Sequence, residues 1–82
     1  MIPTPEEVQL MLRAEPFQPL QVRLTDGTTY FITNPKLNMV TRHHFLIGSP
    51  DPTDSRLAKD IDRIHWSRVA SVVRLVPENT VA

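Results

Sequence analysis

The sequence predicts an α+β fold, mostly β, in which one N-terminal helix precedes a five-stranded antiparallel small barrel. Three observations lead to this prediction. A complete helix start signal stands at Thr4, the hydrophobic period changes from helical to two at Leu20, and the pair Asp26-Gly27 joins two strand-like segments. We expect a single domain over residues 1–82, because a chain of 82 residues is too short to bury two cores.

The first predicted element is a helix over about residues 5–14. Thr4 suits the position that caps a helix, Pro5 fits the first helical position, and Glu7 completes a capping box with Thr4. The apolar side chains recur at helical spacing as Val8, Met11 and Leu12. The helix should end before Pro16, because the residue that precedes a proline avoids the α region.

The segment after the helix predicts a β-hairpin, the first part of a barrel over about residues 18–76. Apolar Leu20, Val22 and Leu24 alternate with polar residues, as in a strand with one buried face. Asp26-Gly27 then marks a tight turn, since glycine accepts the positive φ that such turns need. Residues 28–33 are rich in β-branched and aromatic side chains and form the return strand.

Two further strands and a loop are expected in the middle of the chain. The strands cover Leu37–Arg42 and Phe45–Ile47, with the pair His43-His44 in the turn between them. Residues 48–55 contain two prolines and two aspartates, which are typical of an exposed loop.

The last third of the chain fits two structures. A strand over 60–66, a one-turn break at 67–69 and a strand over 70–76 are favoured, because Val and Ile lose side-chain freedom in helices and pack well in sheets. The alternative is one continuous helix over residues 60–76, since the apolar side chains also match a helical face. Residues 77–82 are expected to form a frayed tail.

Composition limits the class of protein. Nine basic and nine acidic residues cancel without a block of like charge, which is unlike proteins that bind duplex nucleic acid through a basic surface. The apolar runs are too short to span a membrane, and the first residues are unlike a secretory signal. The absence of cysteine fits a reducing compartment. We therefore expect a cytoplasmic protein that, at this size and without disulfides, gains stability by oligomerisation.

The order of one helix and about five short strands, with a one-turn break before the last, resembles the SH3-like and Sm-like small barrels. Val22–Thr28 is similar to the strand, Asp-Gly turn and strand that open the Sm family, and Leu37–Val40 is similar to a later segment of that family. The sequence departs from the family in two places, because it lacks a glycine after the second strand and an Arg-Gly segment in its C-terminal half. The resemblance implies an RNA-binding protein. The candidate RNA contacts are Asn38, Arg42, His43 and His44.

A second resemblance covers more of the chain. It is carried by Pro5-Glu6-Glu7, Leu12–Phe17, Pro19-Leu20, Leu24–Gly27 and Asn34-Pro35, which are similar to segments of short uncharacterised bacterial proteins of the planctomycete type. In these proteins a helix, a Pro-Phe-x-Pro link and an Asp-Gly hairpin recur. The resemblance implies the same architecture and carries no activity that can be transferred.

Three histidines and two aspartates are the candidates for metal or acid–base chemistry. A zinc site needs three or four converging ligands, whereas the adjacent His43 and His44 should point to opposite sides of a strand. Asp60 and Asp62 would share one face of a strand and His65 the other, while on a helix Asp62 and His65 would be neighbours. Neither arrangement supplies a nucleophile with an orienting group. We expect no catalytic residue, no metal and no cofactor.

The aromatic residues predict an interaction surface. Tyr30 and Phe31 lie on opposite faces of one strand, so one of them should be exposed. Trp66, the only tryptophan, suits a core anchor, and its functional alternative is an interface residue. We predict a non-enzymatic binding or assembly module that forms homo-oligomers or binds a protein partner through strand edges or an apolar face. The alternative is the Sm-like RNA-binding protein.

Overall fold

The computed structural model of the chain describes residues 3–75. Its helix α1 (Pro5–Arg13) begins where the capping signal predicts a helix start. The Thr4 hydroxyl accepts a hydrogen bond from the Glu7 N–H at 3.2 Å, and the Glu7 carboxylate accepts one from the Thr4 N–H at 2.9 Å. Because its carboxylate accepts from the Thr4 backbone and hydroxyl, the pKa of Glu7 is lowered. Val8 and Leu12 carry the buried face of the helix.

Thr4→Ala is expected to lower the free energy of unfolding by about 1 kcal/mol, because the Glu7 N–H loses its acceptor at the start of the helix. Urea denaturation followed by circular dichroism measures the loss. Thr33→Ala is the control, since Thr33 is exposed and lies outside the helix, and it should change stability by less than about 0.5 kcal/mol. Equal losses in the two variants would contradict the capping role.

The first sheet, called the β1 sheet after its central strand, contains β1 (Leu20–Leu24), β2 (Thr29–Ile32) and β6 (Val69–Arg74) in the antiparallel order β2-β1-β6. The turn between β1 and β2 has the predicted chemistry. Gly27 has φ +95°, and the Asp26 carboxylate accepts from the Thr28 N–H at 2.9 Å. The hairpin predicted from the sequence is therefore confirmed.

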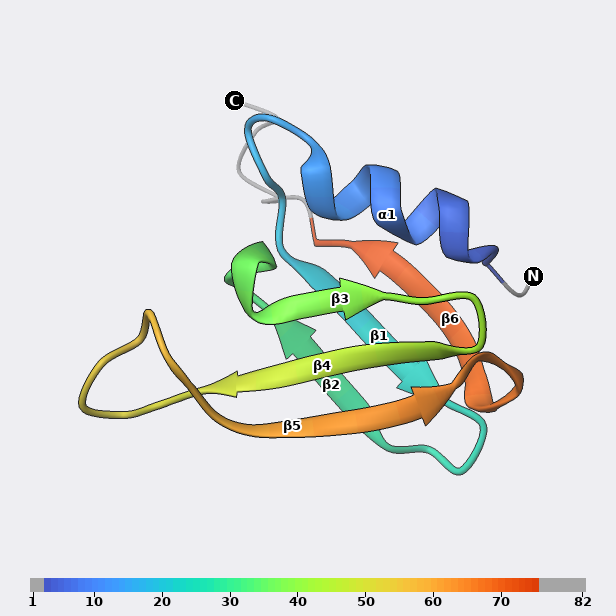
Figure 1. Ribbon diagram of the computed structural model, residues 1–82. Coiled ribbons are helices and arrows are strands. Elements are labelled where there is room, and N and C mark those ends of the chain that lie inside the picture. Colours follow the sequence, from blue (N-terminus) through green and yellow to red (C-terminus); the bar gives the residue numbers. More distant parts are fainter. Residues whose placement is uncertain (1–2, 76–82) are drawn as a thin grey trace.

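The second sheet, called the β4 sheet, contains β3 (Asn38–Val40), β4 (His44–Pro50) and β5 (Ala58–His65) in the antiparallel order β3-β4-β5. Two short 3-10 helices stand where the chain passes between the sheets: η1 (Pro35–Leu37) precedes β3, and η2 (Trp66–Arg68) precedes β6. Figure 1 shows the β4 sheet lying across β1 and β2, with α1 beside β3.

The core lies between the two sheets and the buried face of α1. Phe45 is fully buried and stacks on Trp66, with ring centroids 5.1 Å apart. The indole N–H of Trp66 donates to the Thr41 carbonyl at 2.9 Å, so its polar atom has a partner inside the protein. The other buried apolar side chains are Val8, Leu12, Leu20, Val22, Leu24, Ile32, Ile47, Ile64, Val69 and Val72.

The mostly β class with an N-terminal helix is confirmed, but the prediction of a five-stranded barrel is wrong. Across residues 3–75, six strands form two separate three-stranded sheets, and they do not close into a barrel. The interruption lies at η1. Pro35 has no N–H to donate, and the Asn34 side chain accepts from the Lys36 N–H at 3.0 Å, so this segment leaves the ladder. As a result β2 pairs with β1, and β3 pairs with β4.

The last third of the described chain is strand, 3-10 turn and strand, in the order β5, η2 and β6. The favoured prediction for this segment is confirmed, and the alternative of a continuous helix is wrong. The predicted tail over residues 77–82 lies outside the described residues. Within the described part of the chain, no helix is long and apolar enough to cross a membrane.

Three predicted boundaries in the β4 sheet are also wrong. The third strand is shorter than expected because the Thr41 hydroxyl accepts from the His44 N–H at 2.9 Å and turns the chain there. His44 is therefore the first residue of β4 and not a turn residue. At the other end, β4 continues to Pro50, because Ser49 still pairs with Asp60 on β5. The loop therefore covers residues 51–57, where the prediction was 48–55.

Candidate functional site

The outer face of the β4 sheet, which points away from the core, carries an unusual set of side chains. Phe45 and Ile47 on β4 face the core, so their neighbours along the strand face outward. The register places these outward residues in rows across the sheet. Gly48 lies opposite Ile61, Leu46 stands between Met39 and Arg63, and His44 lies opposite His65.

Apolar side chains on this outer face surround a hollow of about 240 Å³. Met39 is 60% exposed and Ile61 62% exposed, although both are large and hydrophobic. The apolar part of the lining is aliphatic or methionine, without an aromatic ring. The lining residues are Lys36, Leu37, Asn38, Met39, Leu46, Ala58 and Ile61.

A glycine and an asparagine shape the floor of the hollow. A Cβ added at Gly48 would overlap the Leu37 carbonyl oxygen and would lie 3.2 Å from the Leu37 Cβ and 3.3 Å from the Ala58 Cβ. The Asn38 amide group donates to the Asn34 carbonyl at 2.8 Å and accepts from the Gly48 N–H at 3.2 Å. Gly48 thus lets η1 lie close to β4, and Asn38 ties the two together.

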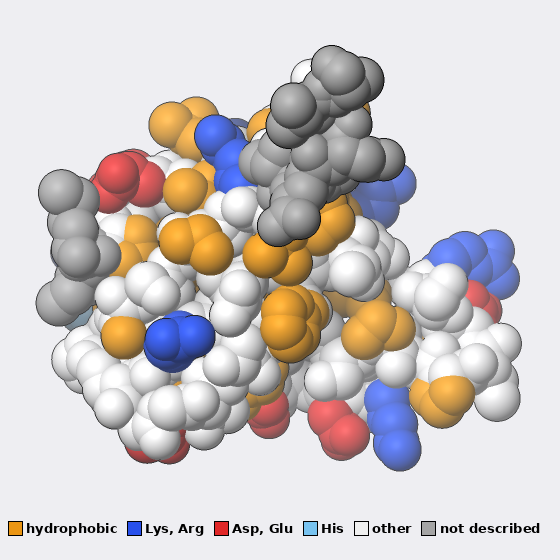
Figure 2. All heavy atoms as spheres, turned by 180° about the vertical axis from the view of Figure 1, so that it is seen from behind, with side chains coloured by type: hydrophobic (Ala, Val, Ile, Leu, Met, Phe, Trp, Pro, Cys, Tyr) orange, Lys and Arg blue, Asp and Glu red, His pale blue; other side chains and the backbone are white. Residues whose placement is uncertain are grey.

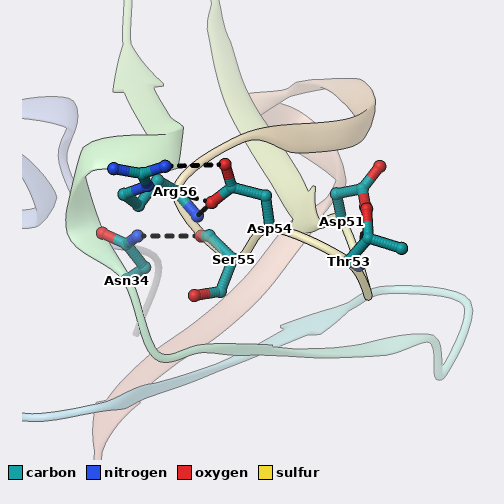
Figure 3. Close-up of polar contacts among 6 residues, drawn as sticks. All are labelled: Asn34, Asp51, Thr53, Asp54, Ser55 and Arg56. Carbon is teal, nitrogen blue, oxygen red and sulfur yellow. Dashed lines mark hydrogen bonds and ion pairs between the residues drawn. The ribbon is translucent and has the colours of Figure 1, made fainter.

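The loop between β4 and β5 borders η1 and holds its own charges. Figure 3 shows the Asn34 side chain donating to the Ser55 carbonyl, at 3.4 Å, beside a closely paired Asp54 and Arg56. The Arg56 backbone N–H, Nε and Nη2 each lie 3.0 Å from an Asp54 carboxylate oxygen. These bonds lower the pKa of Asp54, and bonds from Thr53 lower that of Asp51. The loop carboxylates therefore stay ionised, each hydrogen-bonded within the loop.

The opposite end of the outer face is cationic. This cationic end consists of His43, His44, Arg63 and His65. The His65 ring stacks on His43 with centroids 6.5 Å apart and meets the edge of His44 at 5.5 Å. The His65 Nδ1 accepts from the Ser67 N–H at 3.1 Å, which leaves Nε2 as its other polar atom.

The cationic end lacks a neutralising carboxylate among residues 3–75. The two ion pairs in the described part of the chain join Arg56 to Asp54 and Arg68 to Asp26, and neither pair involves Arg63. The pKa of His44 is lowered from its ordinary value, first by desolvation and then by the positive charges of Arg63, His65 and His43. A bound anion would favour the protonated form of His44 and would therefore raise its pKa.

The structure brings two of the four predicted RNA contacts together and separates the other two from them. His43 and His44 both contact His65 at the cationic end, whereas the Asn38 amide is committed to backbone partners beneath the hollow. Arg42 is exposed in the bend before His43. His65 and Arg63 also belong to the cationic end, which was not predicted from the sequence. The pairing register of β4 with β5, which brings them in, cannot be read from the strands one at a time.

The groups considered for metal or acid–base chemistry do not converge. Among the described residues, no group of three or more His, Cys, Asp or Glu is placed to hold a metal ion. Asp62 lies on the opposite face of β5 from His65, where its carboxylate accepts from the Tyr30 hydroxyl at 2.9 Å. Burial, and then this bond, raise the pKa of Tyr30.

The three predicted interface aromatics have different environments. Trp66 is buried in the core, and Tyr30 is half-buried against it. Phe31 is 62% exposed on the outer face of the β1 sheet, where Gln21 separates it from the partly exposed Val73. Figure 2, which views the molecule from this side, shows hydrophobic side chains gathered over the middle of the face.

Apart from Asn38, the residues around the hollow were not predicted from the sequence. A signal for them was present, because Phe45-Leu46-Ile47 places apolar side chains on both faces of one strand, as do Ile61 and Ile64 on another. Comparison with protein-family models, with curated proteins and with solved structures gives no match to this chain.

Proposed function

We propose that this domain is a non-enzymatic binding or assembly module that docks an extended apolar segment of a protein partner on the outer face of the β4 sheet. The observation that carries the proposal is the hollow, around which Met39 and Ile61 are left more than half exposed. Burying an apolar side chain of this size is worth about 1.5–3 kcal/mol. A contiguous exposed apolar surface is typical of an interaction site.

The chemistry of the lining favours a protein partner over RNA. Single-stranded RNA is held mainly by bases stacked on aromatic rings and by contacts to its phosphates. The hollow is instead lined by aliphatic side chains such as Leu37, Leu46 and Ile61, which suit Leu, Ile, Val or Met side chains of a partner.

Charge favours a different protein over a second copy of the same face. Lys36 at the rim of the hollow and Arg63 beside Leu46 are both basic, and the strand residues of this face include no acidic residue. Two copies joined face to face would bring these cations together and leave them unneutralised. The face therefore suits an apolar segment that carries acidic residues.

Selection of a random-peptide display library against the full chain tests the proposal. We expect the selected peptides to share adjacent or alternating apolar residues. We also expect Ile61→Glu and Met39→Glu to weaken their binding about tenfold or more, because each places a charge inside the apolar contact. Leu10→Glu is the matched control, since Leu10 is 69% exposed on α1, and it should leave affinity unchanged.

Three outcomes would overturn the proposal. Peptide binding that survives Ile61→Glu and is lost in Phe31→Glu would move the docking site to the β1 sheet. Single-stranded RNA bound at 50 mM salt, and released by Arg42→Ala but not by Ile61→Glu, would favour the Sm-like alternative. Light scattering that shows dimers broken by Ile61→Glu would make the occupant a second copy.

A further inference from the structure

We infer that the cationic end binds a carboxylate carried by the docked segment, so that docking selects acidic apolar segments and strengthens as the pH falls. This inference rests on the proposed function, since the carboxylate is held beside an apolar group in the hollow. It goes further by naming a second recognition element and a pH dependence that the hollow alone would not have.

The two parts of the site lie within reach of one small ligand. The row with Ile61 is two residues along β5 from the row with Arg63, which corresponds to about 7 Å at the rise of a β-strand. The row with His44 and His65 follows two residues further on. A chain of five or six carbon atoms anchored in the hollow therefore brings its carboxylate to Arg63, next to His44.

Unpaired positive charge gives the cationic end its preference for an anion. Arg63 lacks an ion-pair partner among residues 3–75, and its guanidinium is suited to bind a carboxylate through two hydrogen bonds. The imidazoles add donors when they are protonated. The groups that face His44 are Arg63 and His65 from β5 and His43 from the turn before β4, and all of them disfavour its protonation.

The sign of the pH effect follows from that arrangement. In the free protein, desolvation and then the positive charges of Arg63, His65 and His43 hold the pKa of His44 below its ordinary value. A bound carboxylate offsets the repulsion and raises the pKa of His44, so each bound anion favours proton uptake. By the same linkage, protonation favours the anion, and affinity rises as the pH falls from 7.5 to about 5.8.

Titration of the full chain with hexanoate and with 1-hexanol, followed by two-dimensional NMR, tests the inference. The two probes share an alkyl chain and differ in the carboxylate. We expect both to shift the Met39 and Ile61 amide signals at pH 7.5 and 5.8. Hexanoate should gain affinity by about two- to fivefold at the lower pH, as expected for exposed charges, while hexanol should not change. The imidazole pKa of His44 should rise with hexanoate alone.

Variants and a third probe separate the possible failures. Arg63→Gln should remove the advantage of hexanoate over hexanol and leave hexanol binding intact, whereas Lys59→Gln, at an exposed position of β5 outside the cationic end, should not. Hexanol binding without any advantage for hexanoate would overturn this inference and leave the proposed function standing. Acetate that raises the pKa of His44 as much as hexanoate would uncouple the cationic end from the hollow. Absence of binding by either alkyl probe would overturn both proposals.

Discussion

Phe45→Ala is expected to lower the free energy of unfolding by about 3–5 kcal/mol, which is most or all of the stability of a domain of this size. Phe45 is fully buried in β4, and its ring stacks on Trp66 at 5.1 Å. Removing it leaves a cavity between the two sheets and α1 that the backbone ladders prevent from collapsing. Urea denaturation at 10 °C, followed by tryptophan fluorescence, measures the loss directly at Trp66.

The matched control for this prediction is the same chemical change at an exposed site. Phe31→Ala removes an identical side chain that is 62% exposed on the outer face of the β1 sheet, and it should change stability by less than about 0.5 kcal/mol. Phe45→Leu should fall between the two, because it keeps most of the buried volume. A similar loss in Phe31→Ala and Phe45→Ala would show that the core is not centred on Phe45.

Gly48→Ala is expected to lower the free energy of unfolding by about 1–3 kcal/mol, because its methyl group has no space. The new Cβ would overlap the Leu37 carbonyl and press on the Ala58 Cβ, so η1 must move away from β4. Since Leu37 and Ala58 line the hollow, the same substitution should weaken hexanol binding. Urea denaturation and the NMR titration measure the two effects.

Gly27→Ala separates steric overlap from backbone strain. Gly27 has φ +95° and open space around its Cβ position, so alanine there should cost about 1–2 kcal/mol through the backbone alone. Its effect should not reach the hollow, because Gly27 lies in the turn between β1 and β2. If Gly48→Ala kept the stability and the hexanol affinity of the wild-type protein, this result would show that η1 is not held against β4.

Local signals in the sequence predicted most of the elements, and long-range pairing decided the rest. The capping box of α1 and the Asp26-Gly27 hairpin depend on neighbouring residues, so both could be predicted. The split into two sheets depends on whether a ladder survives the Asn34-Pro35 segment. That is decided by which strands meet in space. The pattern of side chains along one strand does not contain this information.

In the candidate site, too, only the features that depend on neighbouring residues could be predicted from the sequence. Exposure of one residue of the Tyr30-Phe31 pair follows from strand alternation alone, and the structure shows that this residue is Phe31. The hollow and the cationic end require the register of three strands, because Met39, Leu46 and Arg63 come from separate segments. The sequence does contain one hint, because consecutive apolar residues put apolar side chains on both faces of β4. Without the register, this hint does not say which residues become neighbours.

The 3-10 helix η2 fastens the two sheets at one end of the molecule. On one side the backbone N–H of Trp66 donates to the His43 carbonyl of the β4 sheet at 3.2 Å. On the other side the Arg68 carbonyl accepts from the backbone N–H of Thr25, next to β1, at 2.9 Å. At the far end, where Figure 1 shows η1 and the loop between β4 and β5, the chain leaves the ladder instead. Through these bonds η2 joins the two sheets by their backbones. Bonds from η2 also fix the cationic end, because the His43 carbonyl accepts from Trp66 and the His65 Nδ1 accepts from the Ser67 N–H. The histidines are therefore held in place by the link between the sheets, before any ligand binds.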